Sequence, residues 1–241
     1  MTEPPRIHPL GFFRTPPHDC GYLAGKIAVT MFVDPRVRPD KSSYTLLSQH
    51  GFRRSGAHVY RPRCPACAAC VPIRIPVDSF SPSRGQRRVL KKNADVVLTT
   101  KSADFDQQHF RLYEKYIERR HSGGGMEDPD PNSYLDFLTA SWAETSFVEF
   151  RRGSELIGVA VIDHLDDGLS AVYTFFDPDF GHLSPGRYAI LKEIELTAQL
   201  GLKWLYMGYW IKECRKMSYK SEYFPHQKFV DGQWLDATKQ P

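Results

Sequence analysis

The chain has 241 residues and a formal net charge of +4, and its apolar (41%) and charged (25%) fractions are ordinary for a globular protein. No apolar run approaches the roughly 18 residues of a membrane span, and the first residues show neither the apolar core nor the cleavage site of a secretory signal. Five unevenly spaced cysteines argue against a disulfide framework and favour a reducing cytoplasm.

The positive charge is concentrated in one segment. Between Arg53 and Lys92, ten lysine and arginine residues stand against a single acid, Asp78. Such a block predicts a surface that binds a polyanion such as a nucleic acid. A basic surface that contacts only solvent is the alternative interpretation.

The first hundred residues predict short strands joined by turns rich in proline and glycine. Two brief helices interrupt them, one over 41–52 that is stopped by Gly51, and one that begins near Ser83. The predicted strands cover residues 26–34, 59–64, 70–80 and 94–100.

Helical periodicity begins after these strands. It predicts a helix over 104–122 with Asp104 and Gln107 as a capping box. A turn-rich segment at 121–132 is interpreted as a linker or a ligand-closing loop, and a second helix is predicted over 133–144.

The rest of the chain predicts two strands, 155–165 and 169–178, joined by a hairpin turn, then a helix over 187–200 and a strand over 203–210. This order indicates a mixed α/β layer. It also suits an acetyltransferase-like fold, in which a helix leaves a central strand and its N-terminal turn faces the ligand. We therefore expect a smaller N-terminal domain rich in cysteine and arginine (1–100) and an acetyltransferase-like C-terminal domain (101–241).

Three cysteines follow one another at steps of three residues, Cys64, Cys67 and Cys70. With Cys20 as a fourth ligand, and His18 and His58 as its alternatives, they predict a site for zinc or an iron–sulfur cluster. Spacing alone does not distinguish these two groups. Structural thiols and redox-sensing thiols are the alternatives. Cys214 stands apart and is interpreted as structural or incidental.

The sequence has neither a P-loop nor a G-x-G-x-x-G signature. The segment 182–189 offers only Gly186 where acetyl-CoA-binding enzymes carry a Gly-rich cradle, and a simple helix cap is the alternative. The segment 206–226 interleaves aromatic and basic residues, a pattern that suits stacking of unpaired bases but equally a core. From it we select Lys216, Tyr219 and Lys220 as binding residues.

Several longer stretches carry a family resemblance, which extends from about Thr15 to Pro225. They are CGYL (20–23), the run from YTLLSQ to KKNAD (44–95), RRHSGGGM (119–126), GLSAVYTFFDP (168–178), PGRYAILKEIELTAQLGL (185–202) and YMGYWIKECRKMSYKSEYFP (206–225). Together they resemble the aminoacyl-tRNA–protein transferases, and most of all their bacterial branch, the aspartate/glutamate leucyltransferases, cousins of the eukaryotic arginyltransferases. One departure is Ser184–Pro185–Gly186, where the family pattern has Ser-Leu-Gly.

The resemblance implies that leucine moves from the 3′ end of leucyl-tRNA to the α-amine of a protein beginning with Asp or Glu, which marks that protein for the N-end rule degradation pathway. The ester is already activated, so neither ATP nor another cofactor is required for the chemistry. The attacking amine, with a pKa of about 7.7–8.0, has a useful neutral fraction. Catalysis then consists mainly of positioning and oxyanion stabilisation, and the candidates for a weak base are Asp177, Asp163 and Tyr173.

An acceptor that begins with Asp or Glu presents a carboxylate, which arginine grips best. Arg74, Arg84 and Arg88 are preferred for this role, and contacts to tRNA phosphates or to solvent are their alternative. The basic residues expected to hold the tRNA backbone near its unpaired 3′ end are Lys91, Lys92, Arg215, Lys216 and Lys220.

Three other functions remain open at this point. An arginyl transferase would need a buried carboxylate in its donor pocket, whereas a leucine pocket would be apolar. A metal-stabilised RNA-binding protein without catalysis would need only the cysteines and the basic block. A small-molecule acetyltransferase is disfavoured because its Gly-rich loop is incomplete.

Overall fold

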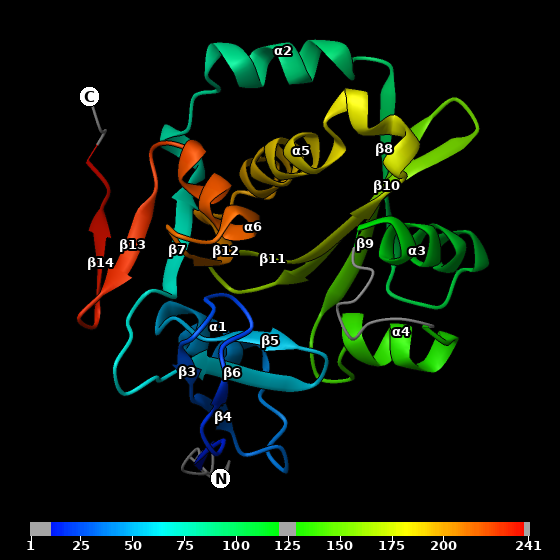
Figure 1. Cartoon of the computed structure of the whole chain (residues 1–241). Helices are drawn as coiled ribbons and strands as arrows, with labels where there is room; N and C mark the ends of the chain where they lie inside the picture. Colours follow the sequence, from blue (N-terminus) through cyan, green and yellow to red (C-terminus); the bar gives the residue numbers. More distant parts are fainter. Residues whose placement is uncertain (1–10, 121–128, 239–241) are drawn as a thin grey trace, which may run out of the picture.

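The computed structural model describes residues 11–120 and 129–238, and an eight-stranded mixed sheet forms its centre (Figure 1). One neighbouring pair, β11 and β12, is parallel, and the other neighbours are antiparallel. In spatial order the strands are β14 (Gln233–Asp236), β13 (Gln227–Val230), β7 (Val71–Pro76), β12 (Trp204–Trp210), β11 (Gly168–Phe176), β10 (Glu155–His164), β9 (Thr145–Arg152) and β8 (Val96–Ser102).

The predicted hairpin is confirmed, because β10 and β11 pair antiparallel and Leu165 N–H donates to Gly168 O at 2.9 Å. The predicted long helix and the strand after it are present as α5 (Pro185–Gln199) and β12. Strand β9 and the β13–β14 hairpin were not predicted, and the prediction of a helix over 133–144 was too long.

Helix ends follow local capping chemistry. Helix α2 (Arg84–Lys92) begins after Ser83, where a helix start was predicted, and Ser83 and Gln86 form a capping box there. The predicted cap of α3 (Gln107–Arg120) was wrong: Asp106 caps it, not Asp104, because Asp106 Oδ1 accepts the N–H groups of Gln108 and His109 at 2.7 and 3.2 Å. The remaining helices are α1 (Lys41–Gln49), α4 (Pro131–Leu138), α6 (Arg215–Ser218) and the 3₁₀ turns η1 (Val77–Ser79), η2 (Pro178–Leu183) and η3 (Tyr219–Glu222).

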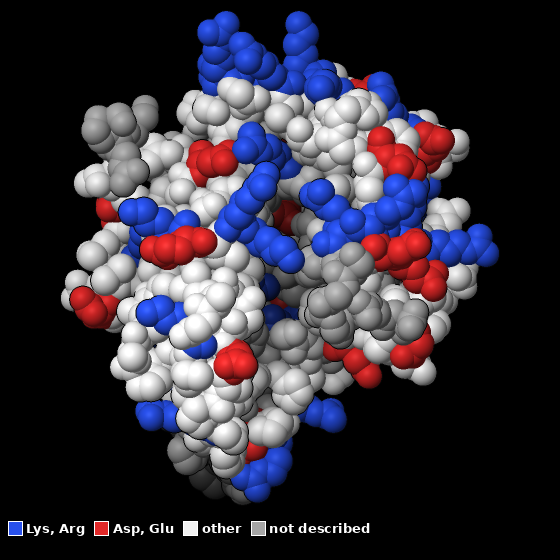
Figure 2. Space-filling view, viewed as in Figure 1, with Lys and Arg blue, Asp and Glu red and all other residues white. Residues whose placement is uncertain are grey.

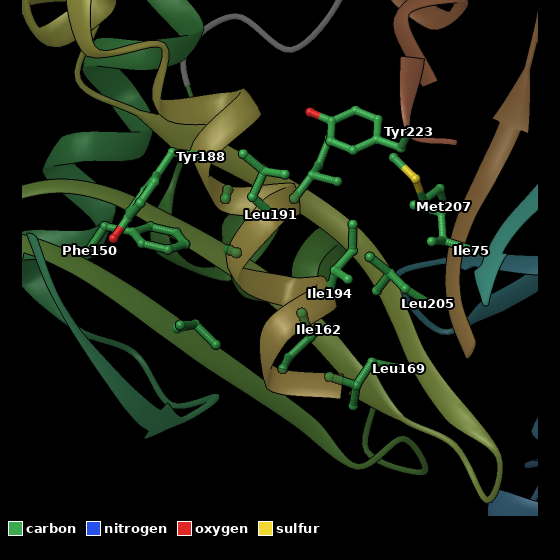
Figure 3. Packing of buried hydrophobic residues seen from close by; sticks show 14 of the residues in the cluster. Ile75, Phe150, Ile162, Leu169, Tyr188, Leu191, Ile194, Leu205, Met207 and Tyr223 are labelled. Atoms are coloured by element: carbon green, nitrogen blue, oxygen red, sulfur yellow. The ribbon is translucent and has the colours of Figure 1, made fainter. Parts of the chain in front are cut away.

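Helix α5 covers one face of the sheet. Its buried side chains, among them Leu191 and Ile194, pack on Ile162 and Leu205 of the strands (Figure 3). Helix α2 lies outside α5 (Figure 1), where Asn93 Nδ2 donates to Leu183 O at 3.0 Å. This face therefore carries two layers of helix over its core.

Helices α3 and α4 cover the opposite face. Tyr113 and Ile117 of α3 and Tyr134 of α4 pack on Val159 and Val161 of β10. The neighbouring Ala160 and Ile162 belong to the core under α5, because successive side chains of a strand point to opposite faces. Along the residues described, no helix is long and apolar enough to cross a membrane.

A four-stranded sheet lies beside one end of the large one. Its order is β1 (Phe12–Arg14), β4 (Thr30–Val33), β6 (His58–Pro62) and β5 (Arg53–Ser55), with a small ladder of β2 (His18–Asp19) and β3 (Ile27–Ala28) nearby. Strands β7 and β8, from the first hundred residues, belong to the large sheet. The expected boundary at residue 100 therefore falls inside β8, and the sheet spans both expected domains.

The parallel strands β11 and β12 are paired only at their start. Gly168, Leu169 and Ser170 pair with Trp204, Leu205 and Tyr206. Beyond that point no further pairs join them, and the N-terminal turn of α5 faces the opening. Because no backbone hydrogen bonds join the two strands beyond Ser170 and Tyr206, the sheet is open at this point.

Candidate active site

A cavity of about 1140 Å³ opens where β11 and β12 diverge. Ala171–Thr174 of β11, Met207 of β12 and Gly186 of α5 line it, and so does Arg53 from the four-stranded sheet. Figure 2 shows lysine and arginine side chains around a central hollow with an acidic patch visible inside it. The cavity is thus basic at its rim.

The rim is built from the ends of three helical segments. Arg119 and Arg120 end α3, Arg187 belongs to the first turn of α5, and Arg215 and Lys216 begin α6. All of these side chains are exposed. Arg187 pairs with Glu222 at 2.7 Å, while no ion pair to a described carboxylate engages Arg215 or Lys216.

Arg53 reaches the cavity from β5. Its Nη2 donates to Val172 O on β11 at 2.9 Å. The side chain lies against Gly208, where φ is +70° and an added Cβ would stand 2.4 Å from Arg53 Nη1. A side chain at this position would displace the guanidinium, and the positive φ also favours glycine. Within the described residues Arg53 has no carboxylate partner, which leaves it free to hold an anion from a substrate.

Glu193 lies on the face of α5 that lines the cavity, one turn beyond Ile190. The residue is 2% exposed and neither carboxyl oxygen has a hydrogen-bond partner. Burial raises the pKa of Glu193 to about 8, because a charged carboxylate is costly away from water. This residue was not predicted from the sequence, although an acid between Leu191 and Ile194 on an apolar helix face was a visible signal.

Lys220 lines the same cavity and is buried. Its Nζ donates to Tyr209 O at 2.8 Å. Burial, together with the nearby Arg53 guanidinium, lowers the pKa of Lys220 to about 7. Lys216, Tyr219 and Gly186, also expected as binding residues, line the cavity as well.

The three expected base candidates have different surroundings. Tyr173 lines the cavity, its buried hydroxyl has no hydrogen-bond partner, and burial raises its pKa. Asp177 caps η2 and pairs with Lys115 at 2.6 Å. Asp163 is fully buried and receives two 2.6 Å hydrogen bonds from Arg54. Of the three, only Tyr173 is among the cavity-lining residues.

Arg74 lies outside the cavity lining. Its guanidinium lies 3.6 Å from the ring centroid of Trp204 and 4.3 Å from that of Trp234, and its Nε donates to Gln227 at 2.9 Å. Arg84, Arg88 and Lys91 are exposed on α2, also away from the cavity lining. The structure therefore separates these four residues from the cavity.

The five cysteines are free thiols and partly buried. Burial, together with the thiols of Cys20, Cys64, Cys67 and Cys214, raises the pKa of Cys70 to about 12. The thiols of all four other cysteines therefore interact electrostatically with Cys70. They include Cys214, which stands far from the other cysteines in the sequence. Val29 N–H donates to Cys64 Sγ at 3.5 Å.

One set of three potential metal-ligand atoms lies within 4.8 Å among the residues the structure describes: Asp106, His109 and Glu149. Glu149 Oε2 accepts from Arg151 Nε at 2.8 Å, and His109 Nε2 is 2.8 Å from Glu149 Oε1. Arg151 lies beside this set and pairs with the carboxylate of Glu149, so ion pairing accounts for the cluster.

Two family models match the chain. The model described as the C terminus of arginine-tRNA-protein transferase matches residues 108–230, and the model of its N terminus matches residues 18–88. The matches include both cavity strands, α5 and the cysteine segment.

Curated relatives are similar over nearly the whole chain. A protein of Saccharophagus degradans named aspartate/glutamate leucyltransferase is 49% identical over 95% of this chain and 98% of its own length. Proteins of the same name from Marinobacter nauticus and Pseudomonas aeruginosa are 49% and 48% identical over 96% and 99% of this chain, and 98% and 100% of their own length.

Solved structures show more distant likenesses. A crystal structure of FemX is 8% identical at a TM-score of 0.47, over 87% of this chain and 82% of its own. The C-terminal domain of a putative lysylphosphatidylglycerol synthetase from Agrobacterium fabrum is 10% identical at a TM-score of 0.47, over 70% of this chain and 52% of its own.

Proposed function

Because the chain belongs to the family of arginine-tRNA-protein transferases, we propose that it transfers leucine from leucyl-tRNA to the α-amine of proteins that begin with aspartate or glutamate. The product would carry a destabilising N-terminus for the N-end rule pathway, and the cytoplasm is the compartment that supplies both substrates. The observation that supports the proposal is the cavity at the opening between β11 and β12. It has a basic rim, a buried carboxyl, and an arginine, Arg53, that has no carboxylate partner among the described residues.

The rim arginines and lysines would hold the phosphates of the tRNA 3′ end. Each phosphate is a fixed negative charge, and Lys or Arg side chains that neutralise it release bound counterions. Tyr22, Tyr60 and Tyr219 line the same cavity, and aromatic faces of this kind stack unpaired bases. The exposed basic side chains of α2 would contact the tRNA farther from its end.

Arg53 would bind the carboxylate of the acceptor's first residue. This cavity-lining arginine donates a hydrogen bond to the Val172 carbonyl of β11 and has no carboxylate partner among the residues described. A guanidinium fork matches a carboxylate in two parallel hydrogen bonds. This assignment replaces Arg74, which is enclosed between two tryptophans, as the preferred residue for acceptor recognition.

The apolar side chains that line the cavity, Ala171, Val172, Met207 and Ile190, would accept the leucine side chain. Tyr173, whose neutral hydroxyl is unpaired, would donate to the oxyanion that forms during attack. Arginine as the donor residue is the second candidate, and Glu193 is the observation that favours it, because a guanidinium pocket needs a buried carboxyl.

We further propose that the part of the chain after residue 101 follows an acetyltransferase-like arrangement. A hairpin, a helix and a strand parallel to the hairpin's second strand occur in that order. The first turn of α5 lines the cavity at the point where the strands separate.

Cys20, Cys64, Cys67 and Cys70 would hold zinc or an iron–sulfur cluster, and Cys214 is a fifth thiol near them. Sulfur atoms close enough to interact electrostatically suit either zinc or an iron–sulfur cluster. The bound group would stabilise the loop before β7 and would take no part in the transfer reaction. Metal and sulfide analysis of the purified chain tests this assignment, since a Cys67→Ser variant should lose the bound metal.

The function is tested with the purified chain, leucyl-tRNA or arginyl-tRNA carrying a labelled amino acid, and peptides beginning with Asp, Glu or Ala. We expect labelled leucine on the Asp and Glu peptides and none on the Ala peptide. Transfer of arginine in place of leucine would support the second candidate, and tRNA binding without any transfer would contradict both.

The acceptor site is tested with Arg53→Ala. The KM for Asp and Glu peptides should rise at least tenfold, which corresponds to about 1.4 kcal/mol, while the affinity for leucyl-tRNA changes little. Arg63→Ala, an exposed arginine of the same basic segment that lies outside the cavity lining, is the control. Equal losses in peptide use and tRNA binding would refute the assignment of Arg53.

A further inference from the structure

The carboxyl of Glu193 is buried at the cavity and has no hydrogen-bond partner among the residues described. It is 2% exposed, and neither oxygen is hydrogen-bonded. Buried polar atoms in folded proteins are paired in the great majority of cases, so this group requires an explanation. Its position among the cavity-lining residues of α5 points to a partner that arrives with the substrate.

The surroundings of Glu193 contain no fixed cation that would neutralise it, within the part of the chain that the structure describes. The titratable groups in electrostatic contact with it are Tyr219 and Tyr223, whose pKa values burial raises. Arg187, on the same helix, pairs with Glu222 instead. Lys220 lines the cavity, but its amino group donates to Tyr209 O. Nothing but burial shifts the carboxyl's own pKa.

We propose that Glu193 is the catalytic proton acceptor for the attacking α-amine, an assignment that rests on the proposed function. The amine nitrogen forms a bond to the ester carbonyl carbon, and the bond from that carbon to the ribose oxygen breaks. Glu193 takes the proton that the nitrogen loses and returns it to the departing ribose oxygen. No oxidant, reductant or further reactant is needed.

The chemistry of the site agrees with this role. Burial raises the pKa of the carboxyl to about 8, close to the 7.7–8.0 of an α-amine. A general base works best when its pKa lies near the working pH. A carboxylate with an ordinary pKa would be too weak a base to compete for this proton.

The test measures single-turnover leucine transfer from pre-bound leucyl-tRNA to a subsaturating Asp peptide, from pH 5.5 to 7.5. In the wild-type chain both the peptide amine and Glu193 must lose a proton. The rate constant should therefore rise about a hundredfold per pH unit at the acid end. In Glu193→Gln only the amine titrates, so the rise should fall to about tenfold per unit.

At pH 7.5 the Glu193→Gln rate should be at least a hundredfold below wild type, a gap that narrows toward acid pH. Glu193→Asp keeps a carboxyl and should retain the steep profile at a lower rate. Glu195→Gln is the matched control, because Glu195 lies on the same helix, exposed and paired with Lys192. It should match wild type throughout.

Two results would overturn the assignment while leaving the function intact. One is a Glu193→Gln variant that transfers leucine with the steep profile unchanged. The other is a Glu193→Gln variant that loses only arginine transfer, or in which only the affinity for aminoacyl-tRNA falls. Either outcome would show that Glu193 binds a cation and does not accept the proton. If the wild-type chain transfers nothing to Asp peptides, the proposed function and the role of Glu193 are both overturned.

Discussion

Arg54 and Asp163 form the most deeply buried ion pair described, with both side chains inaccessible to solvent. Arg54 Nε and Nη2 each donate to Asp163 at 2.6 Å, and the hydroxyls of Tyr44 and Thr145 donate to the same carboxylate. This network joins the four-stranded sheet to β10. A buried charge left without its partner is strongly destabilising.

We therefore expect Asp163→Ala to lower the free energy of unfolding by roughly 3–5 kcal/mol, measured by urea denaturation. Asp95→Ala is the control, because Asp95 pairs with Arg152 at an exposed position and such pairs contribute about 1 kcal/mol or less. An Asp163→Asn variant that keeps full stability but loses all transfer would instead support the catalytic role considered from the sequence.

At the scale of elements, α2 presents its basic side chains outward. Arg84, Arg88 and Lys91 follow one another at steps of four and three residues and so share a face of the helix. None of the three has a hydrogen bond or ion pair to another part of the described chain, whereas Asn93 and Gln86 anchor the helix to its neighbours. Figure 2 shows lysine and arginine gathered over this helix.

Replacing Arg84, Arg88 and Lys91 together by alanine should weaken leucyl-tRNA binding at least tenfold at low salt. The dependence of log affinity on log salt concentration should become shallower, by about one unit for each phosphate that is no longer neutralised. The melting temperature and the rate at saturating tRNA should stay near wild type. A triple replacement of the exposed Arg14, Lys26 and Arg38 is the control, and a comparable loss of affinity there would show that net charge alone drives binding.

At the scale of the whole molecule, β7 lies between β12 and β13 in the sheet. Ile73 and Ile75 of β7 are 1% and 0% exposed and belong to the core under α5. The first hundred residues thus complete the sheet on which the cavity is built.

A fragment of residues 101–241 should not unfold cooperatively, in contrast to the full chain. It lacks β7 and most of β8, so β12 and β13 lose their shared neighbour, and each missing core isoleucine removes roughly 1.5–3 kcal/mol of burial. Urea titration followed by near-ultraviolet circular dichroism measures this. A sharp transition in the fragment would show that the division expected at residue 100 is a true domain boundary.

Predictions from the sequence succeeded where local signals act alone. Asp166–Asp167–Gly168 indicated the β10–β11 turn, Ser83 indicated the start of α2, and Gly201 indicated the end of α5. They failed at α3, where Asp106 rather than Asp104 provides the cap, and at β9, whose pairing with β8 and β10 is not a local property.

By itself, the sequence determined the family, the mixed α/β class and the residue types of the chemistry, because these depend on composition, spacing and extended similarity. Only the tertiary structure decided which of those residues meet. Arg53 and Glu193 come to one cavity from segments 140 positions apart, while Arg74 is enclosed between Trp204 and Trp234. The reason is physical: a side chain's role depends on the neighbours that sheet order and burial bring to it, and these are long-range properties of the fold.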